Sequence, residues 1–185
     1  MKQHPIDIIA EVKTVSPFGF ISDRSWEDLF RVAEEIGDMI SIHTDPRWGG
    51  SFELLEKARG LTQKPILAKG IHKEDSDIRR AIECGADFVL VVGRMPSVYT
   101  SKCLIEPLSL AELKSIPLSQ RAVWNSRDLA SGGLKKESFK DARAEFSEWL
   151  CQASNIQTVA DIDQSADAVL VGTHLIEFAE SLINR

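Results

Sequence analysis

Short apolar runs recur along the chain and alternate with longer segments in which apolar residues are spaced three or four apart. A short run that is apolar throughout predicts a strand buried on both faces, as in a parallel sheet. A spacing of three and four predicts a helix with one buried face. We therefore predict strands at Ile8–Val12, Met39–His43, Ile66–Ala68, Asp87–Val92, Cys103–Ile105, Ala122–Trp124, Leu150–Ala153 and Ala168–Val171.

Helix start and stop signals lie between several of these runs. Ser25 fits a helix N-cap, because Asp28 follows three residues later. Gly85 fits the end of another helix, where a residue without a side chain is favoured. We predict helices over Trp26–Ile36, from near Ser51, from Asp75 or Ser76 to Gly85, and over Leu175–Asn184.

The interval between the fourth and fifth predicted strands is unusually short. Arg94–Lys102 has fewer residues than the dozen or so that a parallel crossover with a helix needs. An extended chain of this length still spans a strand. We predict that the helix is missing here and that a bare loop containing Met95, Pro96 and Tyr99 replaces it.

One pattern is repeated within the chain. GADFVLVVG (Gly85–Gly93) returns as SADAVLVGT (Ser165–Thr173), and each copy is a helix end followed by a buried strand. Repeated βα units with short loops predict a parallel sheet, either doubly wound or closed. About eight strands favour closure. We predict the α/β class and a (β/α)8 TIM barrel, as a single domain over residues 1–185.

Composition and charge narrow the classes of function. A formal net charge of −6 argues against a nucleic-acid surface. Cys84, Cys103 and Cys151 lie far apart in apolar contexts, so we expect buried thiols rather than a disulfide framework. No apolar run reaches membrane-spanning length and the N-terminus lacks a signal-peptide core, so we expect no membrane partner and a cytoplasmic location.

Three histidines, His43, His72 and His174, lie near predicted strand ends. Their spacing matches no metal-ligand motif, so we expect loop or rim residues and no metal site. We expect the tryptophans, Trp48 among them, to be packing residues, because no basic groove accompanies them.

Polar residues collect at the carboxyl ends of the predicted strands, where the active sites of such barrels lie. Glu11 and Lys13 share one face of the first strand end and form either a structural ion pair or the floor of a site. The later strands end in Asp45, Lys69, Glu106, Asn125, Arg127, Ser154, Asn155, Gly172 and Thr173. The cations Lys13, Lys69 and Arg127 predict a small anionic ligand. The loops that begin at Ser154 and Gly172 fit a phosphate group.

These residues belong to longer strings that resemble one family. IIAEVKTVSP (Ile8–Pro17) is similar to the first strand and loop of indole-3-glycerol-phosphate synthase, whose pattern is close to IIAEIKRxSP, and WNSRDL (Trp124–Leu129) to its INNRDL. The similarity continues, in the same order, in ISIHTDPRWGGSFELL (Ile40–Leu55), PILAKGI (Pro65–Ile71), CGADFVLVV (Cys84–Val92), IEP (Ile105–Pro107) and ADAVLVGTHL (Ala166–Leu175).

The resemblance implies a lyase of tryptophan biosynthesis. Such an enzyme closes 1-(2-carboxyphenylamino)-1-deoxyribulose 5-phosphate to indole-3-glycerol phosphate, with loss of carbon dioxide and water, and uses no cofactor or metal. The resemblance makes Lys69 the general acid, Lys13 the partner of the substrate carboxylate and Glu106 the base of the dehydration step. The implied catalytic set is Lys69, Glu106, Lys13, Glu11 and Asn125, and the implied substrate-binding set is Ser16, Arg127, Ser154, Asn155, Gly172 and Thr173.

Electrostatics leads to similar expectations without the resemblance. An amine near other cations has its charged form disfavoured, which makes it a readier acid. A carboxylate that faces a lysine stays ionised and is able to act as a base. A lysine and a glutamate on opposite walls of the barrel could therefore serve two successive proton transfers.

The chain departs from the family pattern at several positions. Ala153 stands where a glutamate is expected, Asn155 stands where a glycine is expected, and Gly70–His72 replaces a DFI-like string. The N-terminal segment that covers the barrel mouth in the family is not expected here, because the first strand follows MKQHP almost at once.

Because of these departures, two other functions are also consistent with the sequence. One is a non-catalytic or regulatory homologue that binds a phosphate ligand. The other is a sister lyase that acts on a related phosphorylated sugar amine. Ile71 stands where the family has an aromatic residue that would stack on the anthranilate ring of the substrate. A partner chain that supplies the lid and a homodimer also stay open.

Overall fold

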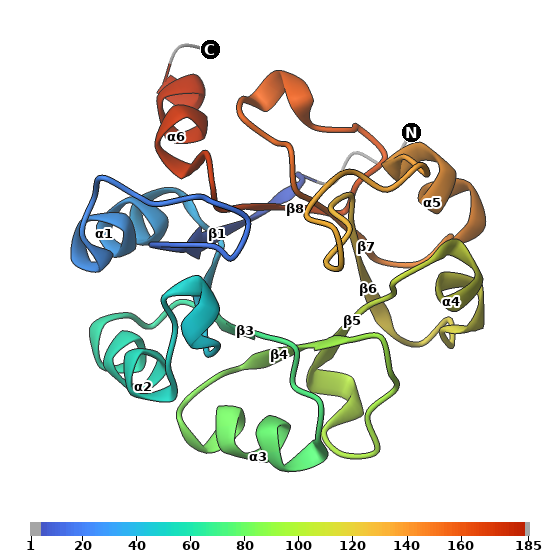
Figure 1. The fold of residues 1–185 in the computed structure, drawn as a ribbon, viewed down its shortest axis with the longest axis horizontal. Coiled ribbons are helices and arrows are strands. Elements are labelled where there is room, and N and C mark those ends of the chain that lie inside the picture. Colours follow the sequence, from blue (N-terminus) through green and yellow to red (C-terminus); the bar gives the residue numbers. More distant parts are fainter. Residues whose placement is uncertain (1–4, 184–185) are drawn as a thin grey trace.

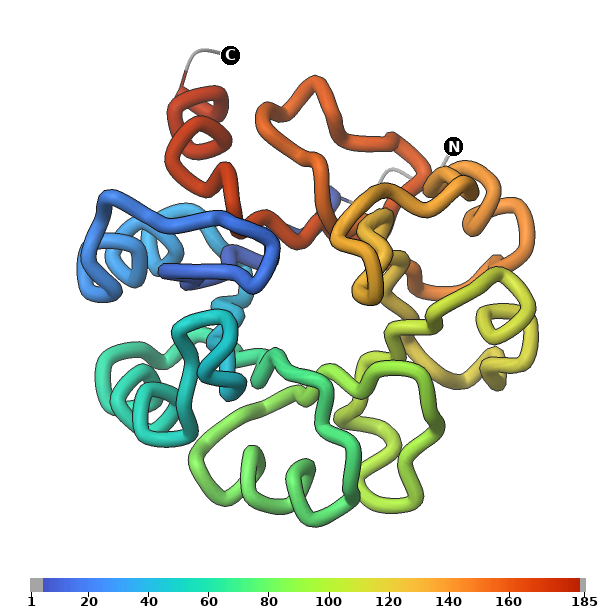
Figure 2. Tube along the Cα trace, in the orientation of Figure 1, coloured from blue at the N-terminus to red at the C-terminus, as the bar shows by residue number. Residues whose placement is uncertain are grey.

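The computed structural model describes residues 5–183, which form a closed barrel of parallel strands inside a ring of helices (Figure 1). The strands pair in sequence order, beginning with β1 (Asp7–Val12) and β2 (Met39–His43). The last strand, β8 (Ala168–Val171), pairs with β1 and closes the sheet. Figure 2 shows this closure, because the blue start and the red end of the barrel lie side by side. The predicted (β/α)8 TIM barrel is confirmed.

The other strands lie close to their predicted bounds. They are β3 (Ile66–Lys69), β4 (Phe88–Val92), β5 (Cys103–Glu106), β6 (Arg121–Asn125) and β7 (Leu150–Ala153). Strands β3, β5 and β6 extend past the predicted ends and include Lys69, Glu106 and Asn125. These three polar side chains are therefore held by the sheet rather than by the loops that follow it.

Both faces of each strand are buried, because side chains alternate between two cores. Ile9, Leu67, Leu104 and Val123 belong to the core inside the barrel. The alternate residues, such as Ile40, pack against the surrounding helices. This arrangement explains why the strands are apolar throughout rather than alternating.

The helices that surround the sheet are α1 (Trp26–Ile36), α2 (Phe52–Leu61), α3 (Asp75–Glu83), α4 (Leu110–Ser115), α5 (Phe139–Glu145) and α6 (Leu175–Ile183). The predicted cap of α1 is present, since the Asp28 amide donates to Ser25 Oγ at 3.1 Å. Helix α6 was predicted to reach Asn184, which lies outside the described residues.

Two βα units of the described chain lack an α-helix. Between β4 and β5 there is only the 3-10 turn η2 (Thr100–Lys102), so the predicted loss of a helix is confirmed. Between β7 and β8 there is only η3 (Val159–Asp161), a second unit without an α-helix, which the apolar pattern does not predict.

The loop that replaces the helix after β4 is fastened to the start of α3. Asp75 accepts hydrogen bonds from Arg94 Nη1 at 2.7 Å and from the Ser97 amide at 3.2 Å. Arg94 Nε also donates to the His72 carbonyl at 3.0 Å. Arg94 thus holds the loop in place.

The described helices include none that is both long and apolar enough to cross a membrane. Cys103 and Cys151 are buried and unpaired, as expected, whereas Cys84 is only half-buried. Burial raises the pKa of the Cys103 thiol to about 11.

Candidate active site

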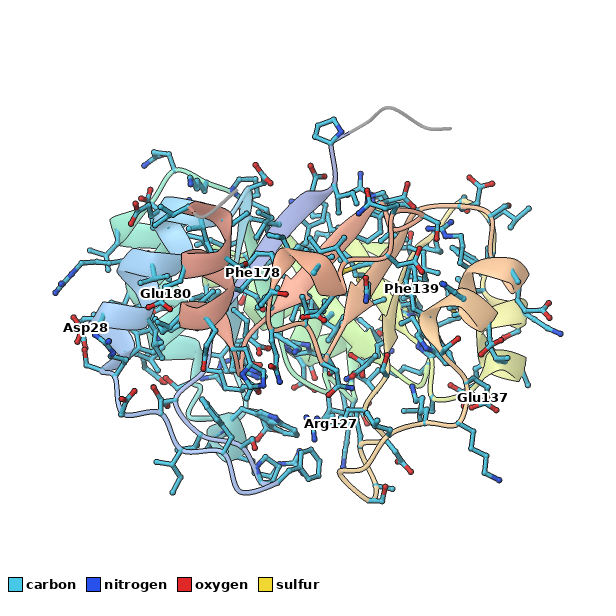
Figure 3. All side chains as sticks on the ribbon, turned by 90° about the horizontal axis from the view of Figure 1, so that it is seen from above. Asp28, Arg127, Glu137, Phe139, Phe178 and Glu180 are labelled. Atoms are coloured by element: carbon cyan, nitrogen blue, oxygen red, sulfur yellow. The ribbon has the colours of Figure 1, made fainter. Side chains whose placement is uncertain are left out.

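The carboxyl ends of the strands surround a cavity of about 320 Å³, a size suited to a small molecule. Arg127 lies at this end of the barrel, among the loops that follow the strands (Figure 3). The cavity is lined by polar residues from the strand ends and by apolar residues: Lys13, Ser16, Phe18, Gly19, Phe20, His43, Trp48, Lys69, Gly70, Ile71, Leu90, Val92, Glu106, Asn125, Arg127, Leu129, Ser154 and Thr173.

Glu11 is the centre of a network of donors on one side of the barrel. Its Oε1 accepts a hydrogen bond from Lys69 Nζ and lies 2.8 Å from His43 Nε2. Its Oε2 lies 3.3 Å from Lys13 Nζ. Lys13 Nζ also donates to Thr173 Oγ1 at 2.7 Å. Strands β1, β2 and β3 are neighbours and β8 closes the barrel, so the sheet itself brings these side chains together.

The charge of the Glu11 carboxylate is stabilised by its partners. Burial alone would raise the pKa of Glu11, but Lys69, Lys13 and His43 hold the pKa well below its usual range. Burial lowers the pKa of the Lys13 amine, and nearby Lys69 adds to this, while Glu11 opposes it. The fall in the pKa of Lys13 has the direction expected for a readier acid.

Gly172 leaves the space that the Glu11 carboxylate occupies. A Cβ atom at Gly172 would lie 1.7 Å from Glu11 Oε2, so the carboxylate would have to shift. The glycine that the sequence assigns to the phosphate loop is therefore also required for the buried network on β1.

A second group of side chains lies on the opposite wall, at the ends of β5, β6 and β7. Asn125 Nδ2 donates to Glu106 Oε1 at 2.8 Å, and Ser154 Oγ donates to Asn125 Oδ1 at 2.6 Å. The amide of Arg127 also donates to Asn125 Oδ1, at 3.0 Å. Asn125 thus connects the carboxylate of Glu106 to the loop after β7.

Burial raises the pKa of Glu106, and Lys69 and the Asn125 hydrogen bond offset this only in part. Lys69 lowers the pKa of Glu106, as expected for a carboxylate that faces a lysine, but burial outweighs this effect. The physical reason is that Glu106 is fully buried and its hydrogen-bond donor is a neutral amide rather than an ammonium group.

Aromatic side chains form one wall of the cavity. Phe18 follows β1, and its ring lies 6.3 Å from that of Trp48, which ends the 3-10 turn η1 (Pro46–Trp48). The Arg127 guanidinium lies 5.8 Å from the Phe18 ring, and its Nη1 donates to the Gly132 carbonyl at 2.7 Å. Trp48 was expected only to pack, but it also lines the cavity.

Ser16 shapes the loop that carries this wall. Its Oγ accepts hydrogen bonds from the amides of Phe18 and Phe20, each at 3.3 Å. Ser16 lines the cavity as well, so the structure places it where a substrate-binding residue is expected.

The loop after β7 has an unusual backbone. Ser154 and Asn155 both have positive φ, at 71° and 57°. Asparagine adopts this left-handed conformation more readily than most residues, so Asn155 keeps a backbone shape that glycine would favour. A small cavity of about 50 Å³ lies here, lined by Lys13, Arg127, Ser154, Asn155, Gly172 and Thr173 among others.

The expectation of loop or rim histidines is wrong for His43, which ends β2 and is 4% exposed. His72 does lie in the loop between β3 and α3, but it is also buried, at 5% exposed. His72 Nε2 bonds to Thr44 Oγ1 at 3.0 Å, and its Nδ1 bonds to the Leu90 carbonyl at 2.6 Å. His43 bonds to Glu11 and is a site residue that the sequence analysis missed.

A signal for His43 exists in the sequence. It ends β2 as Lys69 ends β3, and the two residues are paired in register. The signal is that a polar residue at the end of one strand lies beside a predicted site residue at the end of the next strand. Within residues 5–183, no three or more His, Cys, Asp or Glu side chains are grouped to hold a metal ion.

The fold and the cavity together define a (β/α)8 barrel with buried acidic and basic groups at the carboxyl ends of its strands. A model of the family described as indole-3-glycerol phosphate synthase matches residues 1–183. The chain belongs to this family.

Curated relatives agree with this assignment. The indole-3-glycerol phosphate synthase of Campylobacter curvus is 33% identical over 108 residues, which cover 56% of this chain and 41% of that protein. The tryptophan biosynthesis protein TrpCD of Archaeoglobus fulgidus is 29% identical over 187 residues, which cover 90% of this chain and 34% of that protein. The matched regions thus span less than half of the length of these relatives.

Proposed function

We propose that the protein is a carboxy-lyase that closes 1-(2-carboxyphenylamino)-1-deoxyribulose 5-phosphate to indole-3-glycerol phosphate. One observation carries this proposal: Lys13, Lys69 and Glu106 line a single cavity that has an aromatic wall on one side and a loop suited to an anion on another. Membership of the family supports it.

The substrate is proposed to bind by its two ends. Its phosphate would lie at the loop after β7 and at the start of α6, near Ser154, Gly172 and Thr173, where unpaired helical amides favour an anion. Its phenyl ring would lie against Phe18 and Trp48. This places the ribulose carbons between the two walls of the barrel.

Ring closure is assigned to the charged side of the cavity. Lys69 protonates the ribulose carbonyl oxygen as the aromatic carbon attacks the carbonyl carbon. The Lys13 ammonium lies against the substrate carboxylate until carbon dioxide leaves. Glu11 contacts both amines and orients them, and its own oxygens are already occupied.

Dehydration is assigned to the opposite wall. Glu106 takes a proton from the closed ring and returns it to the leaving hydroxyl group, which departs as water, and Asn125 holds the Glu106 carboxyl in position. The raised pKa of Glu106 suits this role, because a base with a pKa closer to the working pH exchanges protons more readily in both directions.

The direct test is to incubate the purified protein with the carboxyphenylamino-deoxyribulose phosphate and follow indole fluorescence. We expect a rising signal that is lost in a Lys69→Ala variant. A flat trace that equals that of the variant would overturn the proposal.

The same assay separates the alternatives. A binding homologue would be stabilised thermally by the substrate without forming product, and a sister lyase would form product only from a different amino-deoxyribulose phosphate. The aromatic wall favours an aryl amine, because Phe18 and Trp48 offer ring faces even though Ile71 does not. A cytoplasmic location is part of the proposal, and three unpaired cysteines suit a reducing compartment.

A further inference from the structure

His43 is a buried polar residue to which the proposed reaction gives no role. It lines the cavity, and its Nε2 lies 2.8 Å from the Glu11 oxygen that also accepts the Lys69 hydrogen bond. The Trp48 ring is stacked nearly parallel to the imidazole, with ring centroids 5.7 Å apart and an interplanar angle of 2°. The imidazole is therefore fixed in position by a hydrogen bond in its plane and by a ring on its face.

We propose that His43 is a positioning residue that acts through Glu11 on the Lys69 amine. His43 and Lys69 share one oxygen of Glu11, so each limits how closely the other is held. The kinetic consequence rests on the proposed function, whereas the contact itself does not.

The sharing matters when Lys69 gives up its proton. The amine is then neutral and no longer attracts the carboxylate, but His43 and Lys13 keep Glu11 in place. Without His43, Lys69 would be the sole donor to Glu11 Oε1. The carboxylate would then be free to turn towards the Lys69 ammonium group, and the place of the Lys69 amine in the cavity would change with it.

The surroundings favour a neutral imidazole that donates from Nε2. Burial lowers the pKa of His43, Glu11 opposes this, and Lys69 and Lys13 add to it. Asp45 is the other charged group near the ring. His43 Nδ1 is buried and has no hydrogen-bond partner within the described structure, which fits a ring whose single proton is on Nε2.

The kinetic test compares three variants. His43→Leu removes the donor, His43→Gln keeps an N–H group at a similar reach, and His72→Gln is the matched control, because His72 is equally buried but bonds to Thr44 and Leu90 instead. We expect His43→Leu to lower kcat about tenfold or more, as a lost hydrogen bond to a charged group does, with little change in KM. His43→Gln should recover most of kcat, and His72→Gln should keep it.

The split between kcat and KM separates positioning from loss of fold. In His43→Leu kcat should fall while KM stays near that of the wild type, because a displaced Lys69 amine affects the reacting atoms rather than substrate binding. An unchanged kcat in His43→Leu, a rise in KM that accounts for the whole loss, or a His43→Gln variant as slow as His43→Leu would overturn the inference.

A second measurement does not depend on activity. Long-range nitrogen–proton NMR of the imidazole should show the Nε2–H form of His43 in the wild type and a shifted Nε2 resonance in Glu11→Gln. A charged ring or an Nδ1–H form at neutral pH would overturn the inference. A wild type without lyase activity but with the Nε2–H form would instead refute the proposed function alone.

Discussion

The two walls of the cavity each bury a carboxylate, but the pKa of the carboxylate is lowered on one wall and raised on the other. On the wall formed by β1 to β3, Glu11 contacts two lysines and a histidine, and its pKa is held low. On the wall formed by β5 to β7, Glu106 contacts the neutral amide of Asn125, and burial raises its pKa. The two groups are equally buried, so the difference between their partners accounts for the opposite directions of their pKa shifts.

This contrast teaches how one cavity holds two carboxylates for different tasks. A carboxylate surrounded by ammonium groups stays charged and serves to hold them, whereas a carboxyl group next to a neutral amide exchanges its proton more easily. Glu11 is thus suited to organise the site and Glu106 to move a proton.

The largest expected effect is on the charged wall. Glu11→Gln leaves Lys13 and Lys69, which are 12% and 16% exposed, without their counter-ion, so we expect a loss of about 3 kcal/mol in the free energy of unfolding at neutral pH. Urea denaturation would measure it. Because the folded pKa of Glu11 is depressed, its contribution is present above the unfolded value of about 4.3 and is lost as the pH falls through the folded pKa.

As the pH falls below the unfolded glutamate pKa of about 4.3, the wild type should therefore lose more stability than Glu11→Gln. Parallel stability curves for the two proteins in that range would show that the network does not hold Glu11 ionised.

A smaller effect is expected from Gly172→Ala. The added Cβ would overlap Glu11 Oε2, so the carboxylate has to move away from Lys13, and we expect a loss of about 2 kcal/mol. Thermal unfolding would measure it, with Gly60→Ala as the control, because a Cβ at Gly60 meets no atom within 4 Å. Equal stability of the two variants would mean that the contact between β8 and Glu11 is not tight.

The smallest effect has the opposite sign and lies on the other wall. Glu106→Gln removes a carboxyl group whose folded pKa is raised, so it should gain about 1 kcal/mol of stability while losing the proposed dehydration step. The sign follows because Glu106 costs stability as the pH rises from the unfolded value through the folded one. The gain should therefore grow as the pH rises from the unfolded value of about 4.3 through the folded pKa, and be absent in acid. A loss of stability at pH 7 would break the comparison.

Much of the fold could be predicted from the sequence, because the strands are apolar on both faces and the helices on one. The strand Met39–His43 and the helix Trp26–Ile36 have their predicted bounds, and the missing helix after β4 follows from chain length alone. The second helix-free unit was not predicted, because the residues between β7 and β8 are numerous enough to hold a helix and nothing in their apolar spacing excludes one.

The sequence predicts where the candidate site lies but not how its side chains shift one another's pKa values. Strand ends located Lys13, Lys69, Glu106 and Asn125 around one cavity. The direction of the Glu106 pKa and the role of His43 depend on which side chains touch in three dimensions, and spacing along the chain does not contain that information. The catalytic roles themselves remain predictions.

The bond between Lys13 and Thr173 joins residues at opposite ends of the chain, across the pair of strands that closes the barrel. Contacts between residues so distant in sequence carry the greatest loop-closure cost and tend to slow folding. The charged network is therefore incomplete until the last strand has docked beside the first. A nascent or truncated chain that lacks β8 would hold Lys13, Lys69 and Glu11 without the partner loop, so the proposed reaction would become possible only with completion of the fold.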